Sequence, residues 1–127
     1  RTRGKIQTLL NPSFQEKLSA ETRIQLIDPA GFLDMIALEK NARMIVTDSG
    51  GVQKEAYFFA KPCVILREQT EWIEVVEAGA AILTGSDAQK ILEAATQLLS
   101  QTIQTDASIF GNGRAAEFIC EKIIADL

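Results

Sequence analysis

Short apolar runs alternate with segments of helical spacing along this chain. The continuous apolar run at residues 44–46 is typical of a strand in a parallel sheet that is covered on both faces. Further strands are predicted at residues 63–66 and 80–84. Residues 24–28, which Pro29 ends, are predicted to form the first strand. Strands that alternate with helices predict an α/β fold with a parallel sheet, whose ligands bind beyond the carboxyl ends of the strands.

Helices are predicted between these strands and towards both ends of the chain. Ser13 with Glu16, and Ser86 with Gln89, have the spacing of a capping box, while Thr70 suits an N-cap. The predicted helices cover residues 6–10, 13–18, 31–41, 50–59, 71–78, 87–100 and 115–126.

Apolar side chains at helical spacing mark the face by which each predicted helix is expected to pack. In the last helix, Phe118, Ile119 and Ile123 are expected to be buried. Cys63 and Cys120 are expected to be buried thiols of a reducing compartment, with a disulfide between them as the alternative. The remaining candidate core positions are Phe32, Met35, Ile36, Leu38, Val52, Ala56, Phe59, Ile91, Ala95 and Leu98.

Composition narrows the class of protein. The 127 residues are 46% hydrophobic and 24% charged with a net charge of −4, as in an ordinary soluble domain with one core. The longest basic cluster is at residues 1–5, no apolar run approaches the roughly 20 residues of a membrane span, and no signal-peptide pattern is present. We therefore expect a cytoplasmic protein without nucleic-acid or membrane partners. Histidine is absent, which excludes a histidine-based triad and argues against a catalytic zinc site.

A turn with adjacent glycines follows the predicted strand at residues 44–46. The first N–H groups of a helix lack internal partners and lie at the positive end of its dipole, so they can bind a phosphate. Gly50 and Gly51 would let a ligand approach the backbone, and Ser49 adds a hydroxyl donor. Glu55, one helical turn after Gly51, can reach a sugar hydroxyl beside that phosphate. The alternative is a plain helix start that Asp48 or Ser49 caps.

A series of motifs continues from this turn to the end of the chain. It begins with Asp-Ser-Gly-Gly-Val-Gln-x-Glu-Ala at residues 48–56 and passes through Lys61-Pro62 to a strand that ends at Arg67. It then takes in Thr70-Glu71, Gly85 and Phe-Gly-Asn-Gly-x-Ala-Ala at residues 110–116. In order and spacing, this series resembles the nucleotide-binding segment of the non-hydrolysing UDP-N-acetylglucosamine 2-epimerases.

This resemblance implies a Rossmann-like parallel sheet, the C-terminal half of a two-domain GT-B-type architecture. Residues 1–127 would form a single-domain fragment, the nucleotide-binding C-terminal domain, without its first strands and without the upstream catalytic domain. In the relatives, two strands lie between those that match residues 24–28 and 44–47. We therefore expect either that residues 24–28 move in beside residues 44–47, or that a second copy covers this edge in a homodimer.

The resemblance also implies an isomerase of UDP-2-acetamido sugars that needs no metal or nicotinamide cofactor. Family members remove the proton at C2 and expel UDP, and the resulting glycal is rebuilt with C2 inverted. The acid and base carboxylates belong to the N-terminal domain, so we expect no catalytic residue and no activity in this chain alone. The whole protein would act in the biosynthesis of cell-envelope polysaccharides.

The substrate-binding roles implied for this chain concern the UDP, which leaves and returns during the reaction. Met35 would line the uracil ring, with plain core packing as the alternative. Arg67 belongs to the Arg-x-x-Thr-Glu pattern of the family. The complete set implied for substrate binding is Ser49, Gly50, Gly51, Glu55, Arg67, Thr70, Glu71 and Met35.

One departure from the family pattern bears on the substrate. Trp72-Ile73-Glu74 stands where the N-acetylglucosamine epimerases usually have Arg-Pro-Glu. A Thr-Glu-Trp sequence resembles the branch that acts on UDP-2,3-diacetamido sugar uronates, although Trp72 can equally be a packing residue. Two other classes stay open: the sugar-nucleotide-binding domain of a GT-B glycosyltransferase and a non-catalytic nucleotide-sensing module.

Overall fold

A computed structural model describes residue 4 and residues 11–126, which divide into the units Arg1–Gly31 and Phe32–Leu127. The predicted helix at residues 6–10 lies outside the described residues. The first unit contains α2 (Pro12–Ala20), which begins after Asn11 because the Asn11 side chain accepts a hydrogen bond from the Phe14 N–H at 2.8 Å. The predicted capping box of Ser13 and Glu16 is therefore wrong.

Residues 24–28 form no strand, and the prediction of a first strand there is wrong. The side chains of Ile24, Leu26 and Ile27 are all exposed. A strand needs a neighbour to pair its N–H and C=O groups, and the described sheet does not include this segment. The expectation that residues 24–28 move in beside residues 44–47 concerns both units, and it stays a prediction.

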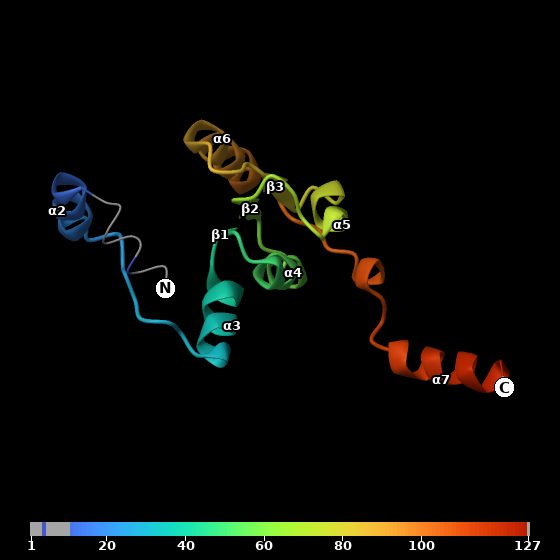
Figure 1. The fold of residues 1–127 in the computed structure, drawn as a ribbon. Coiled ribbons are helices and arrows are strands. Elements are labelled where there is room, and N and C mark those ends of the chain that lie inside the picture. The colour runs from blue at the N-terminus through green and yellow to red at the C-terminus, as the bar shows by residue number, and fades with distance from the viewer. Residues whose placement is uncertain (1–3, 5–10, 127) are drawn as a thin grey trace. The chain divides into compact units, whose positions relative to one another are not determined.

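The second unit is built on a parallel sheet of β1 (Ile45–Thr47), β2 (Cys63–Ile65) and β3 (Ala81–Leu83), in that order (Figure 1). The register pairs Ile45 with Cys63 and Cys63 with Ala81, so the strands end level with one another. The segments that follow the three strands therefore leave the sheet at one edge. The predicted α/β class with a parallel sheet is confirmed.

Helices cover both faces of the central strand β2. On one face, α4 (Gly50–Phe58) and α5 (Ile73–Glu77) share a core with Cys63 and Ile65, to which α4 contributes Ala56 and Tyr57. On the other face, Val64 packs against α6 (Ala88–Leu99), and Figure 1 shows α6 and α4 on opposite sides of the sheet. Successive β2 side chains point to opposite faces, so one strand serves both parts of the core.

The edge strand β1 is less well covered than β2. The exposed fraction of Val46 is 47%, so the predicted burial of this strand on both faces is wrong. Among the described strands, β1 pairs with β2 alone. The homodimer that would cover this edge stays a prediction.

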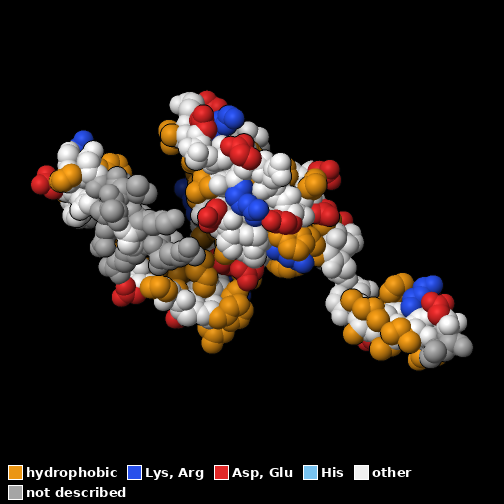
Figure 2. All heavy atoms as spheres, in the orientation of Figure 1, with side chains coloured by type: hydrophobic (Ala, Val, Ile, Leu, Met, Phe, Trp, Pro, Cys, Tyr) orange, Lys and Arg blue, Asp and Glu red, His pale blue; other side chains and the backbone are white. Residues whose placement is uncertain are grey.

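Two helices of the second unit leave their apolar residues exposed. In α3 (Phe32–Asn41), Phe32, Met35 and Leu38 are exposed, and the buried residue is Glu39. In α7 (Ala115–Ala125) no described residue is buried, and Figure 2 shows hydrophobic side chains on its surface. The predicted burial is therefore wrong at Phe32, Met35, Leu38, Phe118, Ile119, Ile123 and Cys120.

Two predicted N-caps lie elsewhere. α5 begins after Trp72, and the Thr70 hydroxyl accepts a hydrogen bond from the Trp72 N–H at 3.1 Å instead of capping a helix at residue 71. α6 begins after Asp87, whose carboxylate accepts from the Lys90 N–H at 2.9 Å, so Ser86 is not the cap. Asp87 combines the hydrogen bond with a negative charge at the helix N-terminus.

The segment between α6 and α7 contains a short 3-10 helix, η1 (Ala107–Phe110), where only a loop is predicted. Cys63 and Cys120 are both free thiols. Burial raises the pKa of the Cys63 thiol to about 12. No helix in the described part of the chain is long and apolar enough to cross a membrane.

Candidate functional site

The N-terminus of α4 is not capped by a side chain. Ser49 occupies the N-cap position, but its side chain makes no capping hydrogen bond, and its own N–H donates to the Thr47 hydroxyl at 3.0 Å. The alternative that Asp48 or Ser49 merely caps this helix therefore has no hydrogen bond to support it. The first N–H groups of α4 are left for another acceptor, and they lie at the positive end of the helix dipole.

The adjacent glycines at this N-terminus have different surroundings. A Cβ atom at Gly50 would lie 3.4 Å from Glu71 Oε2, 3.6 Å from Trp72 Nε1 and 4.0 Å from Arg67 Nη1. A Cβ atom at Gly51 would meet only Ser49 Oγ, at 3.9 Å. Neither glycine has a positive φ angle, so the backbone does not require glycine at either place. Gly51 keeps open space in front of the helix.

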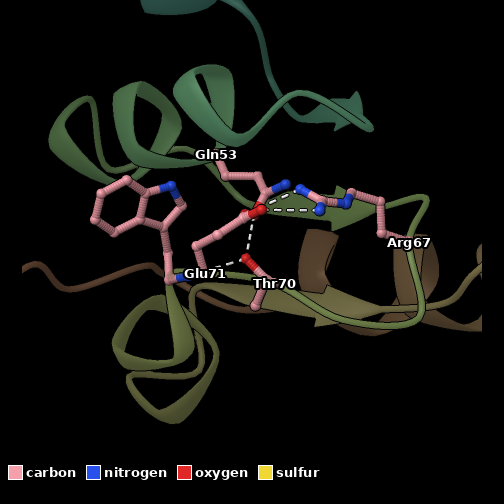
Figure 3. A network of polar contacts seen from close by, with 5 residues as sticks. Gln53, Arg67, Thr70 and Glu71 are labelled. Carbon is pink, nitrogen blue, oxygen red and sulfur yellow. Dashed lines mark hydrogen bonds and ion pairs between the residues drawn. The ribbon is translucent and has the colours of Figure 1, made fainter.

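Arg67 and Glu71 form an ion pair with two parallel hydrogen bonds of 2.9 Å each (Figure 3). The hydrogen bond with Arg67 holds the pKa of the Glu71 carboxyl below its ordinary value, and the same bond raises the pKa of Arg67. Both side chains are exposed, so the pair contributes little to stability. Its importance is positional: a guanidinium with further N–H donors stands beside Gly50.

Thr70 and Gln53 join this loop to α4. The Thr70 hydroxyl donates to Gln53 Oε1 at 2.5 Å, and Figure 3 shows the side chains of Gln53, Arg67 and Glu71 pointing towards one another beside Thr70. The Gln53 side chain is 0% exposed, and its Nε2 has no hydrogen-bond partner among the described residues. Loss of the Thr70 hydroxyl would leave the buried Gln53 Oε1 without a hydrogen-bond donor, which costs free energy. The Thr70–Gln53 hydrogen bond therefore helps to fix the loop that contains Thr70.

Gln53 is a residue to which the sequence interpretation gave no role, although it stands inside the first motif. Gln53, Ala56 and Tyr57 are the buried residues of α4, at the spacing i, i+3 and i+4. A polar residue that shares the helical phase of two core positions is the signal that could have identified it.

Trp72 is a packing residue in this structure. Its ring stands edge-on to Phe110 with the centroids 5.8 Å apart, and Lys54 Nζ lies 4.5 Å from each of these two ring centroids. Phe110 also stands edge-on to Tyr57 at 5.6 Å. These contacts join η1 to α4 and to the start of α5.

Gly85 has a local structural role at the same edge of the sheet. Its φ angle is 60°, and a Cβ atom would clash with the Glu68 carboxylate. Its N–H donates to the Arg67 carbonyl at 3.2 Å. Glycine is required here because other residues rarely adopt this left-handed conformation.

Glu55 and Met35 lie apart from the Arg67–Glu71 pair in the network of described contacts. Glu55 is half-buried on α4, and Met35 is on α3 with part of its side chain exposed. The hydrogen bonds and ion pairs of the described residues link neither of them to Arg67, Thr70 or Glu71. The described residues also contain no group of three or more His, Cys, Asp or Glu side chains that could hold a metal ion.

Comparisons with known proteins give a consistent result. The sequence model of the family described as UDP-N-acetylglucosamine 2-epimerase matches residues 2–124. The UDP-2,3-diacetamido-2,3-dideoxy-D-glucuronate 2-epimerase of Pseudomonas aeruginosa is 46% identical over 123 residues, which are 97% of this chain and 32% of that protein. The UDP-N-acetylglucosamine 2-epimerase of Methanocaldococcus jannaschii is 43% identical over 104 residues, which are 82% of this chain and 28% of that protein.

Solved structures agree with the sequence comparisons. The UDP-GlcNAc 2-epimerase of Methanocaldococcus jannaschii in complex with UDP-GlcNAc and UDP matches 98% of this chain and 33% of its own, with a TM-score of 0.82 and 38% identity. The Neisseria meningitidis UDP-GlcNAc 2-epimerase bound to UDP-GlcNAc matches 91% of this chain and 34% of its own, with a TM-score of 0.70 and 33% identity.

These matches confirm the predicted fold class and family. The solved relatives have the GT-B fold, and the chain spans about a third of the length of the relatives that it matches. The match extends across nearly the whole chain and includes the α4 turn and the Arg67–Glu71 pair. The chain therefore belongs to the UDP-N-acetylglucosamine 2-epimerase family.

Proposed function

We propose that this chain is the UDP-binding part of an isomerase that inverts C2 of a UDP-2-acetamido sugar by elimination and re-addition of UDP. The observation that carries the proposal is the uncapped N-terminus of α4, with open space at Gly51 and the Arg67 guanidinium beside Gly50. The Methanocaldococcus jannaschii relative, whose structure is described as a complex with UDP-GlcNAc and UDP, supports the choice of ligand.

The diphosphate is proposed to bind at this N-terminus. The N–H groups at the start of α4 would donate to the phosphate oxygens, and the uncapped Ser49 hydroxyl would add another donor. Arg67 would give a third contact, because two of its N–H donors bind Glu71 and the others remain. Negative charge grows on UDP as it departs, so donors fixed in this way stabilise the transition state more than the ground state.

Thr70 and Glu71 are proposed to act by holding Arg67 in place. Glu71 fixes the guanidinium through two hydrogen bonds, and Thr70 fixes the loop through Gln53. This assignment makes Arg67 the direct ligand of the three. An ion pair that orients a donor in advance reduces the entropy lost when the ligand binds.

The nucleoside is proposed to extend from the diphosphate along α4. Glu55 lies one helical turn after Gly51, at a distance that suits the ribose hydroxyls when a phosphate occupies the turn. Met35 would line the uracil ring, consistent with its partial exposure. Apolar side chains of α3 that are exposed in this chain offer the base a surface.

The chemistry at C2 is assigned to residues outside this chain. The chain spans about a third of its relatives' length, and we propose that it is their C-terminal domain, which works with an upstream domain that supplies the acid and base carboxylates. The isolated chain is then expected to be inactive. A homodimer, a cytoplasmic location, a role in cell-envelope polysaccharides and independence from metal and nicotinamide belong to the same proposal.

A UDP-2,3-diacetamido sugar uronate is the second candidate substrate. The Pseudomonas aeruginosa relative that acts on such a sugar is 46% identical across 97% of this chain. The Thr-Glu-Trp sequence at residues 70–72 points to the same branch. A panel of UDP-amino sugars, assayed with the protein that contains both domains, would separate the two substrates by their kcat/KM values.

Titration of the ¹⁵N-labelled chain with UDP tests the proposed site. We expect the largest chemical-shift changes at the backbone amides of residues 49–52, with smaller changes at Glu55 and at the Arg67 side chain. Uridine, which lacks the diphosphate, is the matched control and should leave residues 49–52 nearly unchanged. UDP-dependent shifts confined to other regions would overturn the proposal.

A further inference from the structure

The helix α3 buries a carboxyl group and little else. The exposed fraction of the Glu39 side chain is 2%, whereas its neighbours on the helix, Phe32 and Leu33, are largely exposed. Neither oxygen of the Glu39 carboxyl has a hydrogen-bond partner among the described residues. A buried carboxyl without a partner is costly in its ionised form, so this arrangement calls for a functional explanation.

A second carboxyl group affects the pKa of Glu39. It belongs to Glu55 of α4, the helix against which α3 packs. Burial raises the pKa of Glu39 most, followed by the charge of Glu55 and by hydrogen bonding with Glu55. The structure shows no formed hydrogen bond between the two carboxyl groups. Their pairing is inferred from the burial of Glu39 and from the packing of α3 against α4. Within the described part of the chain no cation acts on Glu39, and the flanking Lys40 is exposed.

We propose that Glu39 is a positioning residue for the nucleotide: its protonated carboxyl donates a hydrogen bond to the Glu55 carboxylate and holds that carboxylate towards the ribose hydroxyls. This inference rests on the proposed function, which assigns the ribose to Glu55. A proton turns two carboxyl groups that would repel each other into a donor and an acceptor. Glu55 has two oxygens, so one can accept from Glu39 while the other accepts from the ribose.

The proposal predicts a dependence on pH with a definite sign. Glu39 has a raised pKa, so it is neutral at pH values below that pKa and donates to Glu55. As the pH rises through the raised pKa, Glu39 ionises, the donor is lost and the two carboxylates repel each other. The contribution of the ribose hydroxyls to binding is therefore present at lower pH and lost at higher pH.

The test measures how strongly the chain prefers UDP to 2′,3′-dideoxy-UDP, as the ratio of their dissociation constants. Both ligands carry the same diphosphate, so its own titration cancels in this ratio. The unsubstituted chain should prefer UDP by about 10-fold, the size expected for a hydrogen bond to a charged group. Glu39→Leu should reduce the preference to about 2-fold and leave the affinity for dideoxy-UDP unchanged.

Glu39→Gln keeps a donor that does not titrate, so it distinguishes positioning from a merely structural role. This variant should retain the preference for UDP and should lose its pH dependence. The proposal is overturned if Glu39→Leu prefers UDP as strongly as the unsubstituted chain does, or if Glu39→Gln keeps the original pH profile. If Glu39→Leu does not fold, the Glu39→Gln variant and the pH profile decide. An unsubstituted chain that binds neither ligand overturns the proposed function itself, and the inference with it.

Discussion

The central strand β2 and the edge strand β1 come from similar apolar runs but have different surroundings. Val64 in β2 is 0% exposed, because α4, α5 and α6 together cover both faces of that strand. Val46 in β1 is 47% exposed. An apolar run therefore identifies a strand, but its burial depends on neighbours that the run itself does not specify.

The helices repeat this contrast. α6 and α7 both carry apolar residues at helical spacing, yet α6 buries Ala94 and Leu98 while the described residues of α7 are all exposed. Spacing decides which side chains share a face, and the rest of the fold decides whether a surface receives that face. The interior around β2 and this exposed periphery should therefore respond differently to the same kind of change.

The largest contrast is expected between the two cysteines. Cys63 lies in β2 with a pKa raised to about 12, so at pH 8 only about one molecule in ten thousand carries its thiolate. Cys120 is exposed on α7. We expect one thiol per chain to react rapidly with a disulfide reagent and the second to react only on unfolding. Rapid reaction of two thiols in the folded chain would contradict the interior position of β2, and Cys120→Ser should remove the fast phase.

The next contrast lies within α4, between Tyr57 and Phe58. Tyr57 is buried, its ring packs on Phe110, and its hydroxyl accepts from the Asp106 N–H at 2.8 Å. Tyr57→Ala should lower the free energy of unfolding by about 3–5 kcal/mol. Urea denaturation measures this value. The matched control Phe58→Ala removes an exposed ring and should cost clearly less, and equal losses would show that burial does not distinguish the two positions.

The smallest effect on stability is expected on α7. Ile123 is exposed, so Ile123→Ala should change the free energy of unfolding by no more than about 0.5 kcal/mol. The same truncation in the interior, Leu98→Ala, should cost about 2–5 kcal/mol. Thermal unfolding of both variants in parallel makes the comparison. A large loss from Ile123→Ala would mean that α7 packs against a surface when the chain is in solution.

The sequence was sufficient to predict the elements around β2 and the turn before α4. Residues 24–28 failed as a strand because pairing needs a neighbour, which local propensity cannot supply. Gln53 was detectable from its helical phase with Ala56 and Tyr57. The burial of Glu39 was not detectable from the sequence, because it follows from how α3 packs against α4 and no local pattern marks it.

The binding roles differ in how far the structure supports them. Arg67, Thr70, Glu71 and Gly50 lie together, as their order in the motif series suggests. Contact between the nucleotide and Glu55 or Met35 stays a prediction, because no described contact links either residue to Arg67, Thr70 or Glu71. A family motif predicts which residues bind the ligand. Where two of those residues do not touch each other, a structure with the ligand bound is needed to show that they share one site.

The central claim, that the start of α4 binds the diphosphate of UDP, is tested most directly by Gly51→Val. A Cβ atom at Gly51 meets no protein atom closer than 3.9 Å and the φ angle is not positive, so the variant should fold as the original chain does. Ala88→Val, in the exposed first turn of α6, is the matched control. UDP titration monitored by NMR should show a loss of affinity of about 10-fold or more for Gly51→Val, equal to about 1.4 kcal/mol or more, and none for Ala88→Val. A folded Gly51→Val chain that binds UDP as tightly as the original would contradict the account.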